Sequence, residues 1–185
     1  MRLISTYLLL LIVVLPVVGC AEPATQAPAT AEPTAQVQPA VDPAELIPKG
    51  KLPFDGVLTG GQPSAAQLET LAELGYTTVI NMRGPGERGS TDPALVESLG
   101  MTYVAIPVTG AEDVSEENAR KLAAAMGDGE DPVVVHCASA NRVGALFAMK
   151  AFYVDGMTPE ESLALAKEVG VTRLEPVVRQ QLGLE

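Results

Sequence analysis

Four short runs of β-branched and apolar residues, separated by stretches with helical spacing, are the feature that most limits what this chain can fold into. The predicted strands are Val57–Thr59, Thr77–Ile80, Thr102–Ile106 and Val133–Val135. The last run is apolar at every position, which is typical of a central parallel strand that is covered on both faces. Strands that alternate with helices predict an α/β fold, a three-layer sandwich with a mainly parallel central sheet.

Capping signals frame the helices between these strands. Ser64 and Ser115 are suited to cap helices, and Thr158-Pro159-Glu160-Glu161 forms a capping box with proline at the first helical position. The predicted helices follow Ser64 as far as Leu74, cover Pro93–Leu99, follow Ser115 as far as Met126, cover Val143–Val154, follow Thr158 as far as Gly170, and begin again near Glu175.

The N-terminus has the pattern of a targeting segment. Arg2 precedes an apolar run of eleven residues, Leu8–Val18, which is too short for a permanent transmembrane helix and fits the core of a secretory signal. The run ends in Val17-Val18-Gly19-Cys20, which resembles the bacterial lipobox. We therefore expect a signal peptide over 1–19, lipidation of Cys20, and a protein anchored on the extracytoplasmic side of the bacterial cell envelope, facing the periplasm or in the outer membrane. The alternatives are an ordinary signal peptide or an uncleaved anchor.

Composition divides the rest of the chain in two. Residues 20–48 are rich in Ala, Pro and Thr without hydrophobic periodicity, so we expect a disordered tether there and a single domain over 49–185. The net charge of −11 argues against a nucleic-acid partner, because binding to phosphate backbones needs a basic surface. One His and two widely spaced Cys argue against a metal centre and a disulfide framework.

The residues that could take part in a chemical reaction follow the last predicted strand. Cys137 and Arg142 lie where the strand passes into a helix, at the edge of the sheet where α/β proteins bind ligands. The unpaired N–H groups at the start of that helix attract anions, and with Arg142 they would stabilise a thiolate. A guanidinium also binds two oxygens of a tetrahedral oxyanion at once. This arrangement indicates a cysteine nucleophile that is directed at a bound phosphoryl group.

The pattern His136-Cys137-x4-Arg142 resembles the signature loop of cysteine-dependent protein phosphatases. Three upstream segments are similar to the bacterial beta-lactamase-hydrolase-like group of dual-specificity-like phosphatases, some members of which are labelled sulfur transferases. These segments are Gly60-Gly61-Gln62-Pro63-Ser64, Val79-Ile80-Asn81-Met82-Arg83 followed by Glu87, and Tyr103-Val104-Ala105-Ile106-Pro107-Val108. The resemblance implies a cysteine-phosphatase-like sandwich and no cofactor.

The resemblance also implies roles for individual residues. Cys137 would attack phosphorus and form a phosphocysteine, Arg142 would bind the phosphate, and His136 would orient the loop. Asp113, on the loop after the strand that ends at Ile106, is our candidate for the general acid. The amides expected to bind phosphate belong to Ala138, Ser139, Ala140, Asn141, Arg142 and Val143. The substrate would be a phosphorylated protein or a small phosphomonoester.

Three departures from the phosphatase pattern leave alternatives open. Only four residues separate Cys137 from Arg142, a spacing that also resembles rhodanese, so the second hypothesis is a sulfurtransferase with Cys137 as its persulfide carrier. Ala140 stands where a glycine is usual, and Val143 stands where a hydroxyl residue is expected. A phosphate-binding or phosphoprotein-binding module with little turnover is the third hypothesis. Arg83 and Glu87 are expected to form a structural ion pair beside the Gly84-Pro85-Gly86 turn.

Overall fold

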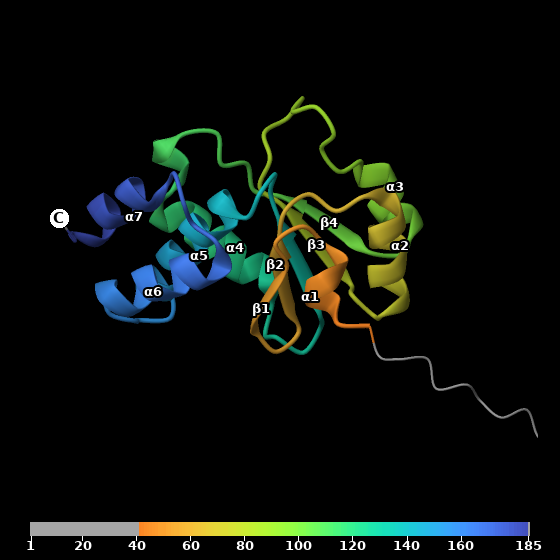
Figure 1. Cartoon of the computed structure of the whole chain (residues 1–185), viewed down its shortest axis with the longest axis horizontal. Helices are drawn as coiled ribbons and strands as arrows, with labels where there is room; N and C mark the ends of the chain where they lie inside the picture. Colours follow the sequence, from red (N-terminus) through yellow and green to blue (C-terminus); the bar gives the residue numbers. More distant parts are fainter. Residues whose placement is uncertain (1–40, 185) are drawn as a thin grey trace, which may run out of the picture. The chain divides into compact units, whose positions relative to one another are not determined.

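One five-stranded sheet forms the centre of the computed structural model, which describes residues 41–184 (Figure 1). The strands are β1 (Lys51–Phe54), β2 (Val57–Gly60), β3 (Thr78–Asn81), β4 (Thr102–Ala105) and β5 (Val133–His136). Their order across the sheet is β1-β2-β5-β3-β4. The β1 and β2 strands pair antiparallel, and every other pair of neighbours is parallel. The predicted mainly parallel sheet is confirmed, with β5 in its middle.

The sequence analysis did not predict β1. This edge strand contains Pro53 and leaves Leu52 and Phe54 exposed, so it lacks the alternating burial by which a strand is recognised. Proline is tolerated on an edge strand because one side of the strand needs no ladder hydrogen bonds. A tight turn at Asp55-Gly56, with φ of +71° at Gly56, joins β1 to β2.

Helices cover both faces of the sheet (Figure 1). One layer holds α1 (Pro43–Leu46), α2 (Ala65–Glu73) and α3 (Pro93–Ser98). The other holds α4 (Glu116–Met126), α5 (Asn141–Tyr153), α6 (Pro159–Val169) and α7 (Glu175–Leu182). A short 3-10 helix, Ala111–Asp113, precedes α4. The predicted three-layer sandwich is therefore confirmed. Among the described residues, no helix has the length and apolarity needed to cross a bilayer.

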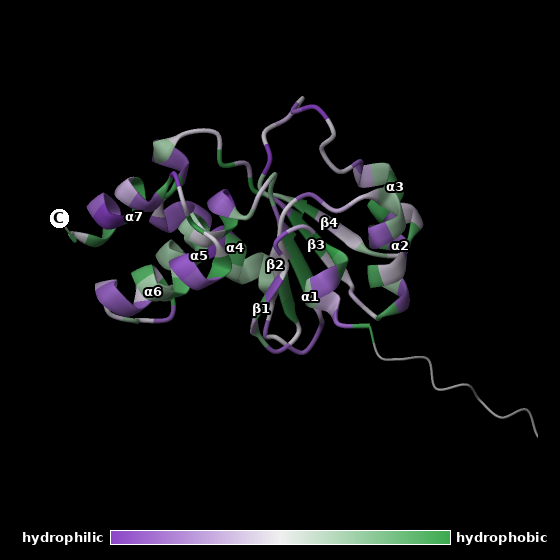
Figure 2. Ribbon diagram, in the orientation of Figure 1, coloured by the Kyte–Doolittle hydropathy of each residue, from purple (hydrophilic) through white to green (hydrophobic). Residues whose placement is uncertain are grey.

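Two apolar clusters fill the spaces between these layers, and the inner sides of the helices are correspondingly hydrophobic (Figure 2). Along β5, Val134 packs into the cluster with α2, whereas Val133 and Val135 pack into the cluster with α5. Alternate side chains of one strand thus enter opposite layers. This explains why the run has no polar position and why it predicted a doubly covered strand.

The capping signals act as predicted. Ser64 and Thr158 each form a capping box, with Gln67 and Glu161 as the reciprocal partners, and the Ser115 hydroxyl accepts from the Asn118 N–H. These caps satisfy backbone N–H groups that otherwise have no acceptor within a helix.

The ordered domain begins before residue 49, so the predicted boundary between tether and domain is wrong for residues 42–48. Asp42 caps α1, Pro43 occupies its first turn, and Ile47 is only 4% exposed within the cluster that contains Leu58. The Pro/Ala-rich composition concealed one capping residue and one buried apolar side chain. The signal peptide predicted over 1–19, Cys20 and the first part of the tether lie outside the described residues.

Candidate active site

The loop between β5 and α5 is built around a strained residue. Ala140 has φ of +68° and ψ of −13°, the left-handed conformation that glycine adopts most easily. The resemblance to the phosphatase loop places Ala140 where a glycine is usual, and the positive φ gives the physical reason for that preference. Its methyl group is fully buried, so packing holds the backbone in this conformation.

The first turn of α5 presents free backbone donors. Helical hydrogen bonding begins with the Gly144 N–H, which donates to the Ala140 carbonyl over 2.9 Å, and no side chain caps the helix. The N–H groups of Asn141, Arg142 and Val143 therefore have no acceptor within the helix. Together with the positive end of the helix dipole, these groups make the loop suited to bind an anion.

Gly61, directly after β2, allows this loop to lie close to the strand. The Cys137 N–H donates to the Gly60 carbonyl over 3.2 Å, and Gly61 forms an isolated bridge with Ser139. A Cβ atom on Gly61 would lie 3.0 Å from the Pro48 carbonyl oxygen and 3.1 Å from that of Ala138. The close approach favours glycine at position 61, whereas a Cβ atom on Gly60 would instead lie 2.7 Å from the Ile47 side chain.

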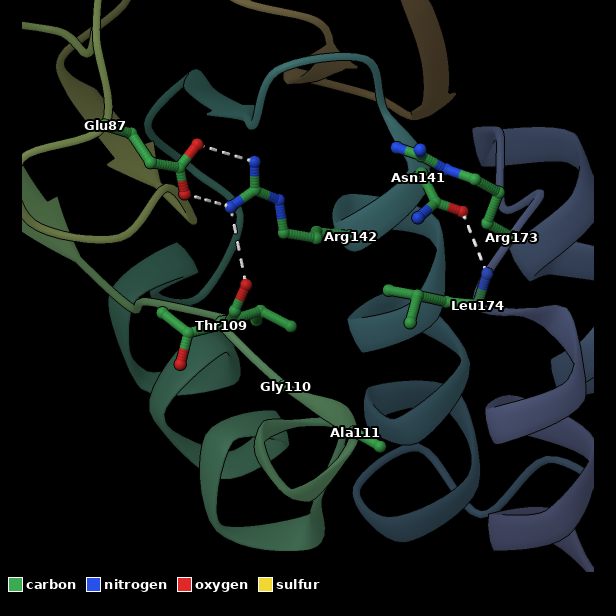
Figure 3. Close-up of a pocket in the computed structure, with 9 residues that line it drawn as sticks. Glu87, Thr109, Gly110, Ala111, Asn141, Arg142, Arg173 and Leu174 are labelled. Carbon is green, nitrogen blue, oxygen red and sulfur yellow. Dashed lines mark hydrogen bonds and ion pairs between the residues drawn. The ribbon is translucent and has the colours of Figure 1, made fainter.

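A cavity of about 360 Å³ opens beside the start of α5 (Figure 3). Three chain segments besides α5 contribute to it: the loop after β3, the loop after β4, and the connection between α6 and α7. The lining residues are Glu87, Val108, Thr109, Gly110, Ala111, Asn141, Arg142, Arg173 and Leu174. The predicted phosphate-binding residues Asn141 and Arg142 thus belong to a real concavity.

Arg142 is held by a carboxylate that the sequence analysis did not assign to it. Its Nη1 lies 2.5 Å from Glu87 Oε1 and its Nη2 lies 3.0 Å from Oε2, while Nη1 also donates to the carbonyls of Met82 and Val108 over 3.4 Å each. A guanidinium has five N–H donors. Within the described residues, Nε–H and one Nη2–H remain without an acceptor, and together they form an edge of the guanidinium that can bind two oxygens of an anion.

The ion pair changes the acidity of both partners. Hydrogen bonds from Arg142 lower the pKa of Glu87 to about 2, helped by the Gly84 N–H and opposed by partial burial. The same hydrogen bonds raise the pKa of Arg142, and the nearby Cys137 sulfur raises it further. The guanidinium is therefore charged at any pH near neutrality.

Cys137 lies at the end of β5, with 1% of its surface exposed, and it does not line the cavity. It is the free thiol of the described residues, and it belongs to the buried apolar cluster beneath α5. The structure thus places Asn141 and Arg142 at the cavity and the Cys137 sulfur at the buried end of the same loop.

His136 anchors the beginning of the loop through a buried hydrogen-bond chain. Its Nε2 lies 3.1 Å from Thr91 Oγ1. The Thr91 hydroxyl oxygen also accepts a hydrogen bond from Gln62 Nε2, and Gln62 Oε1 in turn accepts one from Arg83 Nη1. The Nδ1 atom of His136 lies 3.4 Å from the Cys137 carbonyl, so Nδ1 carries the proton. Burial lowers the pKa of His136 to about 4, which keeps the ring neutral.

Arg83 links this chain of hydrogen bonds to Arg142, because both arginines donate to Glu87. Its Nε donates to Glu87 Oε2 over 3.1 Å, and Glu87 Oε1 accepts from the Gly84 N–H over 2.7 Å. The predicted ion pair at the Gly84-Pro85-Gly86 turn is therefore confirmed. Hydrogen bonds run from the loop's arginine, through Glu87 and Arg83, to the histidine at the loop's other end.

Asp113 does not have the geometry of a proton donor, and the structure gives this predicted role no support. Its Oδ2 accepts from the Thr109 N–H, the Thr109 hydroxyl and the Gly110 N–H over 2.7, 2.9 and 3.2 Å. These bonds lower the pKa of Asp113, whereas a general acid needs a raised one. Asp113 stabilises the turn at the base of the cavity and does not line it.

The other predicted loop residues offer backbone rather than side chains. The Asn141 side chain accepts from Thr172 N, Thr172 Oγ1 and Leu174 N, so it faces the α6–α7 connection. Val143 is fully buried, and Ser139 is half-buried with no hydrogen bond from its hydroxyl among residues 41–184.

The sequence analysis missed Arg173, Gln62 and Thr91 as parts of this site. Gln62 stood within a quoted motif, but no local pattern marks Arg173 or Thr91. In the part of the chain that the structure describes, no group of three or more His, Cys, Asp or Glu is placed to hold a metal ion.

Comparison with known proteins places these features in a family context. Residues 53–180 match the family model PTP-NADK, described as a DSP-PTPase phosphatase fused to NAD+ kinase. A beta-lactamase hydrolase-like protein of Xylella fastidiosa is 29% identical over 115 residues, which cover 60% of this chain and 26% of that protein. The chain thus spans about a quarter of the length of this curated relative.

Solved phosphatase structures share the fold. Tk-PTP in its active form gives a TM-score of 0.59 at 19% identity, covering 73% of this chain and 96% of that one. TpbA of P. aeruginosa, a cysteine-to-serine variant in complex with pTyr, gives 0.55 at 20% identity, covering 78% of this chain and 86% of that one. At these identities the likeness concerns the arrangement of strands and helices.

Proposed function

The chain belongs to the family of DSP-PTPase phosphatases described as fused to NAD+ kinase, and on that premise we propose that it is a cysteine-dependent phosphomonoester hydrolase. The resemblance to beta-lactamase-hydrolase-like phosphatases noted in the sequence is confirmed by curated relatives of that name. The observation that carries the proposal is the uncapped start of α5, where free amides and the Arg142 guanidinium line a cavity and follow closely in sequence on Cys137 at the end of β5.

In the proposed reaction, the phosphoryl oxygens bind the N–H groups at the start of α5 and the free edge of Arg142. The Cys137 thiolate attacks phosphorus, the ester P–O bond breaks, and an alcohol or phenol leaves. Water then attacks the phosphocysteine, the S–P bond breaks, and inorganic phosphate is released with regeneration of the thiolate. The fixed amide and guanidinium donors stabilise the charge that develops on the oxygens.

The leaving group receives its proton from solvent in this proposal. Glu87 is the carboxylate that lines the cavity, and it is ionised and hydrogen-bonded to Arg142, while Asp113 is held by the Thr109–Gly110 turn. A positioned general acid contributes about 10²- to 10⁴-fold to such reactions. Aryl phosphates, whose phenolate needs no proton to depart, are therefore the preferred substrates.

A phosphoprotein carrying phosphotyrosine is one substrate of this type, and the relative TpbA has been solved in complex with pTyr. Small aryl or acyl phosphates are another. We place the enzyme on the extracytoplasmic side of the cell envelope, held by lipid on Cys20. The support for this placement is the lipobox-like Val17-Val18-Gly19-Cys20 after an apolar run.

A phosphate-binding module with little turnover is the second candidate. The engaged Asp113 carboxylate favours it, as does Val143, which supplies no hydroxyl to assist departure of the thiolate from a phosphocysteine. Such a module would bind a phosphate group at the same site but would not hydrolyse it.

Hydrolysis of para-nitrophenyl phosphate by the full chain separates the two candidates. We expect turnover that is abolished by Cys137→Ser, together with inhibition by vanadate. Phosphate binding that persists in both proteins, with no turnover in either, would favour the binding module. A persulfide on Cys137 after incubation with thiosulfate would instead favour sulfur transfer.

The anchor is tested separately in bacterial cells. Radiolabelled palmitate should be incorporated into the wild type and lost in Cys20→Ala, and the wild-type protein should partition into the detergent phase of Triton X-114. A protein that carries no label and partitions into water would overturn the lipidated form without affecting the proposed reaction.

A further inference from the structure

We propose that Arg173 forms a second anion subsite, which selects phosphomonoesters that carry another negatively charged group near the reacting phosphate. The inference rests on the proposed function, because the reacting phosphate defines where the second group must lie. Its basis is the presence of two guanidinium groups, those of Arg142 and Arg173, in the lining of one cavity.

The two arginines reach the cavity from different elements. Arg142 extends from the first turn of α5, and Arg173 extends from the connection between α6 and α7 across Asn141 toward Arg142 (Figure 3). The cavity volume of about 360 Å³ lies within the range of small-molecule sites and exceeds what one phosphoryl group fills. A substrate bound at the amides therefore extends toward Arg173.

Arg173 differs from Arg142 in having no partner among the described residues. Arg142 is paired with Glu87, whereas within residues 41–184 the side chain of Arg173 makes no hydrogen bond or ion pair. Every other arginine in this range except Arg88 is paired with a carboxylate. An exposed guanidinium near a second one raises the electrostatic free energy of the empty cavity, and a bound anion lowers it.

Hydrogen bonds to Asn141 fix the backbone on either side of Arg173 against the loop between β5 and α5. Asn141 Oδ1 accepts from Thr172 N over 2.8 Å and from Leu174 N over 3.2 Å, the residues on either side of Arg173. The residue that offers its amide to the phosphate thus also positions the second cation. This preorganisation reduces the ordering cost of binding a dianionic ligand.

The charges that line the cavity support this ligand class. Glu87, Arg142 and Arg173 together give a net charge of about +1 before binding, in a chain whose net charge is −11. Glu87 is fully engaged by Arg142 and by Arg83, so it does not neutralise Arg173. The second group is a carboxylate or a second phosphoryl group, both of which a guanidinium binds in the same planar fashion.

A matched pair of substrates tests the subsite on the full chain. The substrates 3-carboxyphenyl phosphate and 3-carbamoylphenyl phosphate have nearly the same shape and differ by one negative charge. For the wild type we expect kcat/KM to be about five- to tenfold higher for the carboxylate, mostly through KM. The preference should vanish in Arg173→Gln and partly return in Arg173→Lys.

Arg88→Gln is the control, because Arg88 is exposed, does not line the cavity, and loses the same charge. It should keep the preference. Equal ratios in the wild type and Arg173→Gln, with both substrates hydrolysed, would overturn the subsite and leave the phosphatase intact.

Calorimetry with the Cys137→Ser variant tests binding without turnover. Methylenebisphosphonate should bind at least about fivefold more tightly than methylphosphonate, and Arg173→Gln in the same background should remove the difference. If that difference is found while no aryl phosphate is hydrolysed by the wild type, the subsite stands and the proposed hydrolysis fails. If the two phosphonates bind with equal affinity both to Cys137→Ser and to the variant that also carries Arg173→Gln, the subsite for a second phosphoryl group is refuted.

Discussion

Glu87 and Arg142 meet end to end, with both carboxylate oxygens facing both terminal nitrogens at 2.5 and 3.0 Å. The two residues are 55 positions apart in sequence, so the pair connects the loop after β3 with the start of α5. Because the carboxylate occupies the tip of the guanidinium, the edge formed by Nε and the remaining Nη2–H stays available. Glu87 therefore orients Arg142 for a bound anion.

Replacing Glu87 with Gln should lower kcat about tenfold on an aryl phosphate and change inhibition by inorganic phosphate less than about threefold. The amide cannot accept two charge-assisted hydrogen bonds, so Arg142 loses orientation, while the loop amides continue to bind phosphate. Steady-state kinetics with phosphate as inhibitor checks this. The control is Glu116→Gln, which removes the same charge from an exposed pair with Arg120. An unchanged kcat in Glu87→Gln would show that this pair is only structural.

Buried His136 predicts a loss of stability in mildly acidic solution. Its pKa is about 4 in the folded protein against 6.5 for an ordinary histidine, because burial disfavours the charged ring. Between these values the unfolded chain binds a proton that the folded protein does not, so the free energy of unfolding falls as the pH falls from 6.5 to 4. From pH 7 to pH 5 the loss is about 2 kcal/mol.

Urea unfolding at these two pH values measures this loss, with His136→Gln as the comparison. A glutamine at this position titrates in neither state, so the variant's stability should be nearly the same at both values, whatever its stability at neutral pH. Carboxylates with lowered pKa, such as Glu87 and Asp113, destabilise the fold only at lower pH and do not produce this slope. Equal slopes in the two proteins would rule out His136 as the source.

Asp113→Asn should reduce kcat for an alkyl phosphate, whose alkoxide needs a proton to depart, by less than about threefold and leave the alkaline side of its pH profile unchanged. The Asn side-chain oxygen still accepts from the Thr109 N–H, so the turn is kept. A true general acid would instead be worth about 10²- to 10⁴-fold and would control the alkaline side. A pH profile of kcat for both proteins decides between the two roles, and a large loss would restore Asp113 as the proton donor.

The strain at Ala140 predicts opposite responses to two substitutions. Ala140→Gly relieves about 1–2 kcal/mol of strain from the left-handed backbone conformation. It also loses about 0.8 kcal/mol from burial of the methyl group and gives the unfolded chain more conformational freedom. The free energy of unfolding should therefore change by less than about 1 kcal/mol. Ala140→Val should cost about 3 kcal/mol or more, because a β-branched residue cannot adopt φ of +68° in a fully buried position. Urea unfolding at pH 7 measures both, and a stable Val variant would contradict the strained conformation.

The parts of the structure that were predictable have local causes. Caps at Ser64 and Thr158, the apolar run Val133–Val135 and the loop that ends at Arg142 are each defined by a few neighbouring residues, so a single sequence contains the information. Ala140 was marked only by the resemblance, because the phosphatase loop usually has glycine at the position that adopts a positive φ here.

The parts that were missed depend on tertiary contacts. The partner of Arg142 is Glu87, far away in sequence, and Arg173 enters the cavity only because Asn141 holds its backbone. Ile47 is buried in the apolar cluster that also contains Leu58 of β2 and Leu68 of α2, whereas its Pro/Ala-rich surroundings in the sequence indicated a tether. Asp113 had the residue type and position of an acid, but its hydrogen bonds to Thr109 and Gly110 are visible only in the folded loop.

Trapping the covalent intermediate tests the central claim most directly. The full chain is mixed with para-nitrophenyl phosphate, quenched within the first turnover and digested, and the peptide that contains Cys137 is examined by mass spectrometry separately from the one that contains Cys20. The account predicts a phosphoryl group on the Cys137 sulfur, absent from the Cys137→Ser and Arg142→Ala variants. Release of phosphate at an undiminished rate from Cys137→Ser, with no labelled cysteine at any time, would contradict it.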